Sequence, residues 1–315
     1  MIDEPQQAAL GDVSRVGETT PLVSVGLPTY NRASSLRRAV DSVLAQDYSN
    51  LELIISDNAS SDQTASFCEE YATGDVRVRY VRQDVNRGAH NNFATVLDRA
   101  VGKYFMWLGD DDWLDKSYLS RCVSVLRARP DVSLVCGVPT YVEDGRRVAE
   151  GVKIDVQQES PSARVVAFYN QVSDNGTFYG VARRDVLLEN PAPAVLAGDW
   201  LMIASLAFLG KIVTIDDIAV FRSSRGVSAD VRLLARQLGL SEKEARQPHR
   251  SIASNVARDI ARNSRAFHNL NVVSRWILAE KCAIAVHRRF VEVDDPITAI
   301  TRWGRTTLKQ LLHLA

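Results

Sequence analysis

Residues 22–57 read LVSVGLPTYNRASSLRRAVDSVLAQDYSNLELIISD, and this stretch decides the fold class. An apolar run at residues 22–27 is closed by Pro28, and residues 34–46 then place leucine and valine side chains at helical spacing. A second apolar run follows at residues 51–56. The stretch therefore predicts a strand, a loop, a helix and a second strand, which together form a βαβ unit.

The same alternation continues along the chain. It predicts strands at 76–81, 104–108 and 132–137, and helices near 62–71, 89–101 and 116–127. Such an α/β pattern indicates a Rossmann-like, mostly parallel sheet, whose ligands bind beyond the carboxyl ends of its strands. After Pro139 the sequence is irregular. It then predicts an amphipathic helix at 199–209, a strand pair at 212–221, and helices at 229–238, 249–266, 270–290 and 296–313.

Composition places the chain among globular proteins. It has 315 residues, of which 46% are hydrophobic and 24% charged, which excludes disordered and disulfide-scaffold classes. The four cysteines form no C-x-x-C pair, so a zinc ribbon is not expected. Residues 1–20 are acidic and polar rather than basic and then apolar, so we expect a flexible leader on a cytoplasmic chain.

Charge divides the chain into two parts, although the net charge is zero. Residues 222–315 contain 17 Lys and Arg against 8 Asp and Glu, a net charge of +9, and the preceding residues carry the opposite balance. This basic tail lacks a recognised nucleic-acid-binding motif, so nucleic acid is not expected as a partner. Its apolar residues suit three alternatives, which are peripheral contact with an anionic membrane, a homodimer interface, or packing on the rest of the chain: Val272, Val273, Trp276, Ile277, Leu278, Ile300, Trp303 and Leu308.

The predicted loops after the first three strands carry candidate nucleotide contacts. Tyr30 offers a ring that can stack on a base, and Asp57 offers an acceptor for a base N–H or a ribose hydroxyl. Gly88 permits close backbone approach beside Arg87, a candidate phosphate contact. Asn31 and Asp62 have a simpler alternative role as helix N-caps.

The loop after the fourth predicted strand reads LGDDDW over residues 108–113. Its three adjacent carboxylates repel one another, and hard oxygen ligands suit Mg²⁺ or Mn²⁺. The alternative is a solvated acidic turn that caps the next helix. The chain has neither a G-x-G-x-x-G nor a Walker lysine motif, which disfavours a dehydrogenase or a P-loop enzyme.

Taken in order, these segments resemble the nucleotide-binding half of a family-2 glycosyltransferase with the GT-A fold. The resemblance covers roughly residues 21–126 and rests on VSVGLPTYNRASSLRRAVDSVLAQDYSNLELIISDNASSD, NRG and YFMWLGDDDWLDKSYL. It implies a nucleotide-sugar donor, a divalent Mg²⁺ or Mn²⁺ ion, and inversion at the anomeric carbon.

The resemblance also assigns site residues. The nucleotide-binding set it implies is Pro28, Tyr30, Arg32, Asp57, Asn86, Gly88 and Asp110. Gly109 stands where the usual metal motif begins, so counting from Leu119 places the metal ligands at Asp111 and Asp112. An Asp-x-Asp register would use Asp110 and Asp112 instead.

On the acceptor side the resemblance implies Asp199 as the catalytic base, at the start of a helix beside Trp200. The alternative for Asp199 is an N-cap bonded to the amide of Met202 or Ile203. Trp200, Arg222 and Arg225 are candidate diphosphate or acceptor contacts, and Ser224 replaces the histidine found there in many family members. The aromatic pair Phe178 and Tyr179 would either stack on a sugar ring or pack in the core.

These observations predict a flexible leader at 1–20, a GT-A domain at 21–228 and a helical region at 229–315. Within the GT-A domain, residues 21–137 form the nucleotide-binding half and residues 138–228 the acceptor half. The expected activity is inverting transfer of a sugar from a UDP- or dTDP-sugar to a glycan or lipid-linked acceptor in polysaccharide or glycoconjugate synthesis. The alternative is a non-catalytic nucleotide-binding or interaction protein on a degenerate transferase scaffold.

Overall fold

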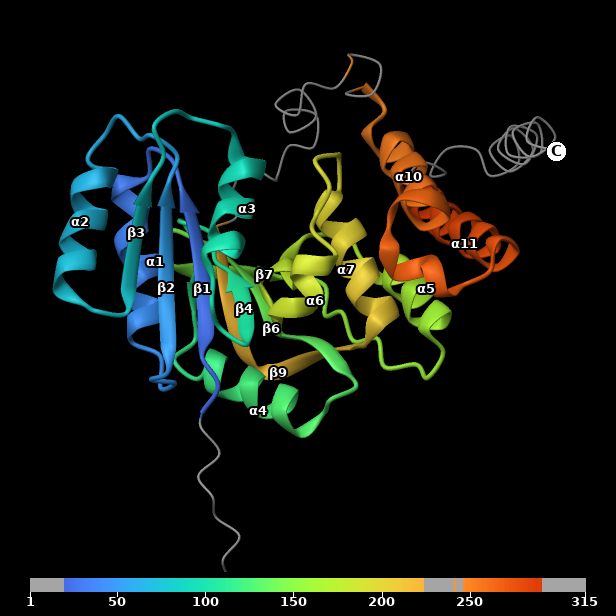
Figure 1. Cartoon of the computed structure of the whole chain (residues 1–315), viewed down its shortest axis with the longest axis horizontal. Coiled ribbons are helices and arrows are strands. Elements are labelled where there is room, and N and C mark those ends of the chain that lie inside the picture. The colour runs from blue at the N-terminus through green and yellow to red at the C-terminus, as the bar shows by residue number, and fades with distance from the viewer. Residues whose placement is uncertain (1–19, 224–240, 242–245, 291–315) are drawn as a thin grey trace, which may run out of the picture.

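The chain forms one nine-stranded sheet flanked by helices (Figure 1). A computed structural model describes residues 20–223, 241 and 246–290. The strand order is β3-β2-β1-β4-β8-β6-β9-β5, and β7 pairs with β6. The strands are β1 (Val23–Thr29), β2 (Leu51–Asp57), β3 (Val78–Arg82), β4 (Tyr104–Trp107), β5 (Trp113–Leu114), β6 (Val132–Glu143), β7 (Arg146–Glu150), β8 (Val181–Arg183) and β9 (Lys211–Ser223).

The first four strands are parallel, as predicted. Every residue of β1, β2 and β4 is buried, which is typical of parallel strands covered on both faces. The connecting helices are α1 (Ala33–Leu44), α2 (Thr64–Gly74), α3 (Ala89–Arg99) and α4 (Tyr118–Ala128). The predicted strands and helices of this half are thus confirmed, with ends displaced by a few residues, except that the strand predicted at 132–137 continues through Pro139 to Glu143 as β6 and so enters the stretch expected to be irregular.

The second half is a mixed sheet. Strand β8 runs antiparallel to both β4 and β6, whereas β6 and β9 are parallel to each other. The predicted strand pair at 212–221 is instead the single long strand β9, whose register shifts against β6 between Gly137 and Val138. That irregularity bends one continuous strand at the place where the sequence suggested a turn.

Helix α7 (Gly198–Leu209) is buried almost all round rather than amphipathic. Ten of its twelve residues are buried, and Leu209 at its end is exposed. A helix that is apolar on all sides needs neighbours on all sides. The sheet supplies one side, and α5 (Pro161–Gln171) and η4 (Arg265–Asn269) supply others. Short helices η1 (Gly176–Tyr179) and α6 (Arg184–Glu189) lie between β6 and α7 in the chain.

The carboxyl-terminal described segment is helical, as predicted. Helix α10 (Pro248–Arg258) continues through a π-helical turn, η3 (Asp259–Asn263), and η4, and α11 (Val272–Phe290) follows. These helices pack beside α5 and α7 and share their hydrophobic core (Figure 1). The leader, the predicted helices at 229–238 and 296–313, the boundary near residue 228 and Arg225 lie outside the described residues.

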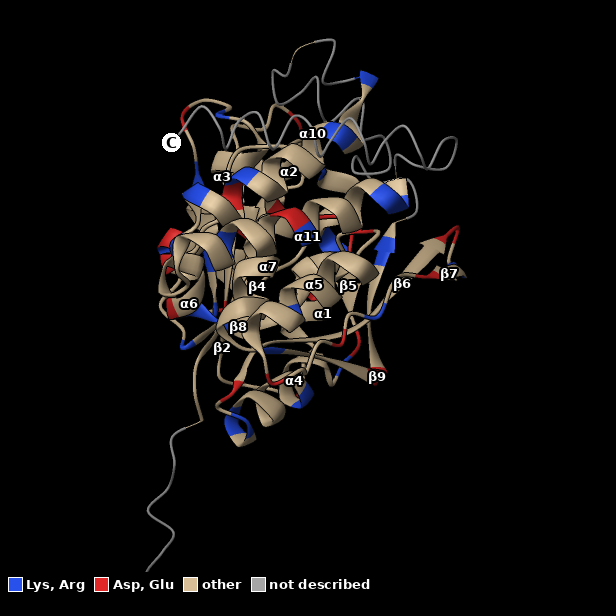
Figure 2. Cartoon of the chain, turned by 90° about the vertical axis from the view of Figure 1, so that its right-hand side faces the viewer, with Lys and Arg blue, Asp and Glu red and all other residues tan. Residues whose placement is uncertain are grey.

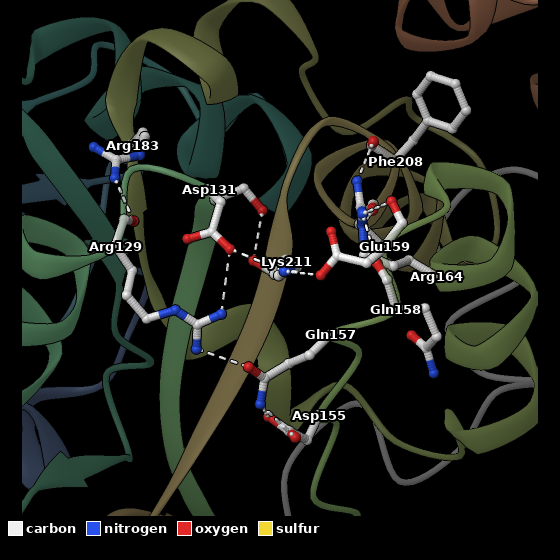
Figure 3. Close-up of polar contacts among 12 residues, drawn as sticks. Arg129, Asp131, Asp155, Gln157, Gln158, Glu159, Arg164, Arg183, Phe208 and Lys211 are labelled. Atoms are coloured by element: carbon white, nitrogen blue, oxygen red, sulfur yellow. Dashed lines mark hydrogen bonds and ion pairs between the residues drawn. The ribbon is translucent and has the colours of Figure 1, made fainter.

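A polar network at the amino ends of β6 and β9 joins the sheet to α5 (Figure 3). Lys211 Nζ lies 3.1 Å from Asp131 and 2.6 Å from Glu159. Beside it, the buried Arg164 donates to the last carbonyls of α7, at 2.6 Å from Ala207 O and 2.9 Å from Phe208 O. Arg164 thereby caps the carboxyl end of the buried helix, where carbonyl groups lack partners within the helix.

We predict that Arg164→Ala destabilises the fold by about 3 kcal/mol, because it leaves buried carbonyls without donors. The measurement is urea unfolding at equilibrium. Arg129→Ala is the matched control, since Arg129 makes a partly exposed ion pair with Asp131 at 3.3 Å, and it should cost less than about 1 kcal/mol. Equal losses in the two variants would contradict the capping role.

Candidate active site

Four loops meet at the carboxyl edge of the parallel strands. Because β3, β2, β1 and β4 are adjacent and parallel, the residues that follow them lie side by side (Figure 1). The segments concerned are 30–32, 58–63, 83–88 and 108–112. The prediction that function-bearing loops share one edge therefore agrees with the topology.

The loop after β1 is joined to the loop after β2. Asn31 has a φ of 53° and its Oδ1 accepts from Ser61 N at 2.8 Å, so it ties the loops together and does not cap α1. Asp62 is not the N-cap residue of α2, which is Gln63, but its carboxylate accepts from the first amides of two helices, Thr64 N at 3.0 Å and Ala33 N at 3.3 Å. Tyr30 is 44% exposed, which leaves its ring accessible at this edge.

Pro28 lies within β1 and is buried, and Arg32 follows the loop. Arg32 Nε lies 3.8 Å from Asp110 Oδ1, so the first loop and the acidic loop after β4 meet here. Thr29 reinforces the contact, because its hydroxyl donates to Asp110 Oδ2 at 2.8 Å. Burial raises the pKa of Asp110 to about 7, against the lowering effect of that hydrogen bond.

Asp57 ends β2 and has no exposed surface. Its carboxylate accepts from Ser60 N at 2.9 Å and from the Tyr80 hydroxyl at 3.0 Å, and Arg82 Nε lies 4.0 Å away. These bonds hold the loop after β2 against β3. A nucleotide group would meet Asp57 only by joining or replacing these partners.

Asn86 and Gly88 form a compact turn with Asn58, whose role the sequence did not indicate. Asn86 Oδ1 accepts from Asn58 Nδ2 and from Gly88 N, both at 2.8 Å. Gly88 has a φ of 83°, a conformation that favours glycine.

Asn92 is a second structural residue that the sequence did not indicate. Its buried amide donates to Thr29 O at 3.1 Å and Ser56 O at 3.0 Å, and so ties the ends of β1 and β2 together.

The acidic loop separates its three carboxylates. Asp112 is 2% exposed, whereas Asp111 is partly exposed, and both have an oxygen against Gly109. A Cβ on residue 109 would lie 2.7 Å from Asp112 Oδ2, so the glycine at this position makes room for the carboxylate. Burial raises the pKa of Asp112 to about 6, although the nearby Arg222 guanidinium opposes this.

Arg222, near the end of β9, is the counter-ion of Asp112. Its Nε lies 3.4 Å from Asp112 Oδ2, and Ser223 N donates to Asp112 Oδ1 at 3.3 Å. Arg222 is itself 5% exposed, donates to Asn175 Oδ1 at 2.7 Å, and lies over the ring of Tyr179 at 4.6 Å from its centroid. The candidate phosphate contact is therefore engaged with the predicted metal ligand.

Asp199 lies in the first turn of α7 and is partly exposed. Its Oδ1 accepts from the amide of Trp200 at 3.0 Å, and the N-cap residue is Ala197, with a φ of 60°. The predicted capping bond to Met202 or Ile203 is thus replaced by a bond to the next residue. Burial raises the pKa of Asp199, while the Trp200 amide and the charge of Arg222 act in the opposite direction.

Tyr179 lies near both the acidic loop and α7, because Arg222 lies over its ring and pairs with Asp112, and its helix η1 contacts α7. Burial raises the pKa of the Tyr179 hydroxyl, and the charges of Asp112, Asp111 and Asp199 add to that effect. Phe178 and Tyr179 are 8% and 6% exposed, and Phe178 stacks on Trp107 at 4.6 Å between centroids. The packing alternative for this aromatic pair is correct, since both rings are buried in the hydrophobic core.

The carboxylates fit a divalent ion in one particular way. Within the described residues there is no group of three or more His, Cys, Asp or Glu side chains arranged to hold a metal. However, Mg²⁺ is commonly held by one or two carboxylates with substrate phosphates as further ligands. One oxygen of Asp111 and one of Asp112 lie against Gly109, so these two carboxylates are the candidates for such a set.

A groove of about 990 Å³ lies at the opposite edge of the sheet. Its lining includes Pro21, before β1, and Lys103, before β4, together with residues of α4. It contains none of the predicted site residues, so the chemistry-bearing side chains and this groove are separate features of the fold.

Several curated proteins are similar to this chain. It is 31% identical to the GalNAc(5)-diNAcBac-PP-undecaprenol beta-1,3-glucosyltransferase of Campylobacter jejuni over 171 residues. The aligned segment covers 54% of this chain and 54% of that protein. It is 31% identical over 97 residues to glycosyltransferase GlyA of Streptococcus pneumoniae, covering 31% of this chain and 14% of GlyA. An uncharacterized protein of Mycobacterium tuberculosis is 31% identical over 200 residues, 62% of this chain and 56% of that protein. The chain spans at most 56% of the length of these three relatives.

Solved structures share the fold at low sequence identity. TarS 1-349 of S. aureus superposes with a TM-score of 0.60 at 18% identity, covering 89% of this chain and 77% of that one. The same fragment in complex with UDP-GlcNAc superposes with a TM-score of 0.54 at 20% identity, covering 84% of this chain and 81% of that one. The mannosyltransferase PcManGT from Pyrobaculum calidifontis, in complex with GDP-Man and Mn²⁺, superposes with a TM-score of 0.53 at 19% sequence identity. The superposition covers 91% of this chain and 80% of that one. The predicted GT-A fold is confirmed by these likenesses.

The family assignment rests on the larger part of the chain. The model of the family described as "Glycosyl transferase family 2" matches residues 24–189, a segment that contains the parallel strands and the acidic loop and ends before Asp199 and Arg222. The chain therefore belongs to glycosyl transferase family 2.

Proposed function

We propose that the protein transfers a sugar from a nucleotide diphosphate sugar to a hydroxyl acceptor, with inversion at the anomeric carbon. The observation that carries the proposal is the joining of the acidic loop, through Asp112, to Arg222 and Tyr179, with the helix that bears Asp199 packed against η1, at the edge where nucleotides bind in such folds. The donor we propose is UDP- or dTDP-linked. In support, the similar TarS structure is a complex with UDP-GlcNAc.

The nucleoside would occupy the edge between the first and third loops. Tyr30, exposed at this edge, supplies a ring for the base, and Arg32 supplies a cation next to Asp110. Pro28, Asp57, Asn86 and Gly88 shape the pocket from behind, since their contacts fix the loops. In this proposal the acceptor binds over α7, near Trp200.

A divalent Mg²⁺ or Mn²⁺ ion held by Asp111 and Asp112 would neutralise the diphosphate as it leaves. The charge balance favours such an ion, because the three carboxylates of the acidic loop outnumber Arg32 and Arg222 before any phosphate arrives. Arg222 lies beside Asp112, so a diphosphate bound there would meet its guanidinium. The neighbouring PcManGT structure contains Mn²⁺.

Asp199 would act as general base. Its carboxylate takes the proton of the acceptor hydroxyl while that oxygen forms a bond to the anomeric carbon and the bond from this carbon to the diphosphate oxygen breaks. The electron pair of the broken bond leaves with the nucleotide diphosphate. Its partly buried environment and raised pKa suit a carboxylate that must accept a proton.

The remaining assignments are also proposals. We divide the chain into a leader at 1–20, a nucleotide-binding half at 21–137, an acceptor half at 138–228 and a helical region at 229–315. A glycan or lipid-linked acceptor is supported by the Campylobacter jejuni relative, which is named for a PP-undecaprenol-linked acceptor. With such an acceptor, the protein would take part in polysaccharide or glycoconjugate synthesis at the cytoplasmic face of a membrane. No helix of the described segments is both long and apolar enough to span a bilayer.

We predict that Asp112→Asn lowers the Mn²⁺-dependent affinity for UDP by about tenfold or more, since it removes one of two metal ligands. Isothermal calorimetry with and without EDTA measures this. Asp217→Asn is the matched control, because Asp217 forms an exposed ion pair with Arg121. UDP affinity that is unchanged both by EDTA and by Asp112→Asn would rule out the metal role.

We predict that Asp199→Asn lowers kcat by about a hundredfold or more and leaves donor affinity nearly unchanged, because a general base acts in the transition state. The assay is sugar transfer or donor hydrolysis at saturating donor. Asp185→Asn is a close control, since Asp185 also bonds to the amide of the following residue, Val186, at 2.9 Å in a first helical turn but is exposed. A protein that binds UDP yet neither transfers nor hydrolyses any donor would instead support the non-catalytic alternative.

The pH dependence gives an independent test. Because burial raises the pKa of Asp199, its protonated and inactive form persists to higher pH than for an ordinary aspartate. We therefore expect kcat to fall as the pH decreases through an acidic limb lying above the usual aspartate range. Rate profiles of the wild type and Asp199→Asn measure this, and a limb that survives in the variant belongs to another group.

A further inference from the structure

The outer face of α11 combines exposed apolar and basic side chains. Val273 and Ile277 are 68% and 48% exposed, and Ile284 is partly exposed further along the helix. Lys281 and Arg288 are exposed beside them. At 100° per residue these five side chains fall within a sector of about 80°, so they form one continuous stripe, called here the α11 outer face.

The opposite side of α11 is buried against other helices. It packs on α5, α10 and η3 with the buried residues Leu278, Ala279, Cys282, Ala283, Ala285 and Val286. Leu278, which the sequence grouped with the other apolar residues of the basic tail, is a core residue at 3% exposure. The core needs only one side of this helix, so core packing does not explain the apolar outer face.

Further groups of the same character border the α11 outer face. Val272 is 68% exposed, and Trp276 is partly exposed with Arg262 lying 5.4 Å from its ring centroid. Glu280 is an acidic residue on the border of the face and is exposed. A tryptophan beside basic side chains is typical of helices that lie in the interface of a membrane.

The charge of the surrounding segment is strongly positive. Residues 246–290 contain nine Lys and Arg against two acidic residues, a net charge of +7. Figure 2 views the molecule from this side, with Lys and Arg recurring along α10 and α11. A surface that joins apolar side chains to such an excess of cations is complementary to an anionic lipid bilayer.

We propose that the α11 outer face docks on an anionic membrane surface and so holds the enzyme next to a lipid-linked acceptor. The part concerning the acceptor rests on the proposed function, whereas docking itself does not. The face is rigidly connected to the candidate base, because Phe290 at the end of α11 contacts Trp200, with ring centroids 5.9 Å apart. Val273 begins the face about 25 Å from that contact along the helix.

The test is flotation of the full chain with vesicles of phosphatidylcholine alone and of phosphatidylcholine mixed with phosphatidylglycerol. We expect flotation only with the anionic vesicles, and we expect it to fade with added salt. Lys281→Glu with Arg288→Glu, and separately Val273→Ser with Ile277→Ser, should each lower the bound fraction by about tenfold or more. The controls are Lys103→Glu, at the opposite sheet edge, and Val76→Ser, at a fully exposed valine; both should float like the wild type.

Outcomes against the proposal are equally definite. No flotation together with a dimeric mass in light scattering would assign the face to a second copy of the chain. Flotation that is equal on neutral vesicles, or that survives both double variants, would overturn docking through this face. The double variants should still bind UDP with Mn²⁺, and Asp111→Asn, which leaves the buried Asp112–Arg222 pair intact, should still float, so failure of docking and failure of the proposed function are distinguishable.

Discussion

A buried ion pair between Asp112 and Arg222 joins the two halves of the site. Asp112 belongs to the loop after β4 and Arg222 to the end of β9, and both are almost fully buried. Removing one member of such a pair typically costs about 3–5 kcal/mol, since the remaining charge is left without compensation. Arg222 also donates hydrogen bonds to Asn175 and Tyr141, so the segments that contain these two residues are held to the acidic loop through one guanidinium.

The same pair shows how the fold accommodates the adjacent carboxylates of the acidic loop. Adjacent carboxylates repel each other strongly in a medium of low dielectric constant. The fold relieves the repulsion by separating them, with Asp110 held by Thr29 and Arg32, and Asp112 held by Arg222 and the Ser223 amide. Asp110 and Asp111 remain partly exposed, whereas Asp112 is buried.

Local hydrophobic patterns in the sequence predicted the strands and helices of the parallel half, because consecutive residues form each βαβ unit. The predicted order of strands also placed the four loops at one edge of the sheet and pointed to Asp110, Asp111 and Asp112. It did not predict that Arg222 pairs with Asp112, since the two are 110 residues apart and the pairing depends on the register of β9. Nor did it identify Asn92, whose amide is satisfied by two carbonyls from different strands.

The burial of α7 ties the acceptor side to the carboxyl-terminal helices. A helix that is apolar on all faces cannot be stable on the sheet alone, and its outer side is covered through contacts such as Phe208 with Phe267 and Trp200 with Phe290. Asp199 sits in the first turn of this helix, so its position depends on that covering. The helices at 248–290 therefore belong to the architecture of the site. Changes in them that disturb α7 should alter the acceptor side before they alter the loops that follow β1, β2 and β3.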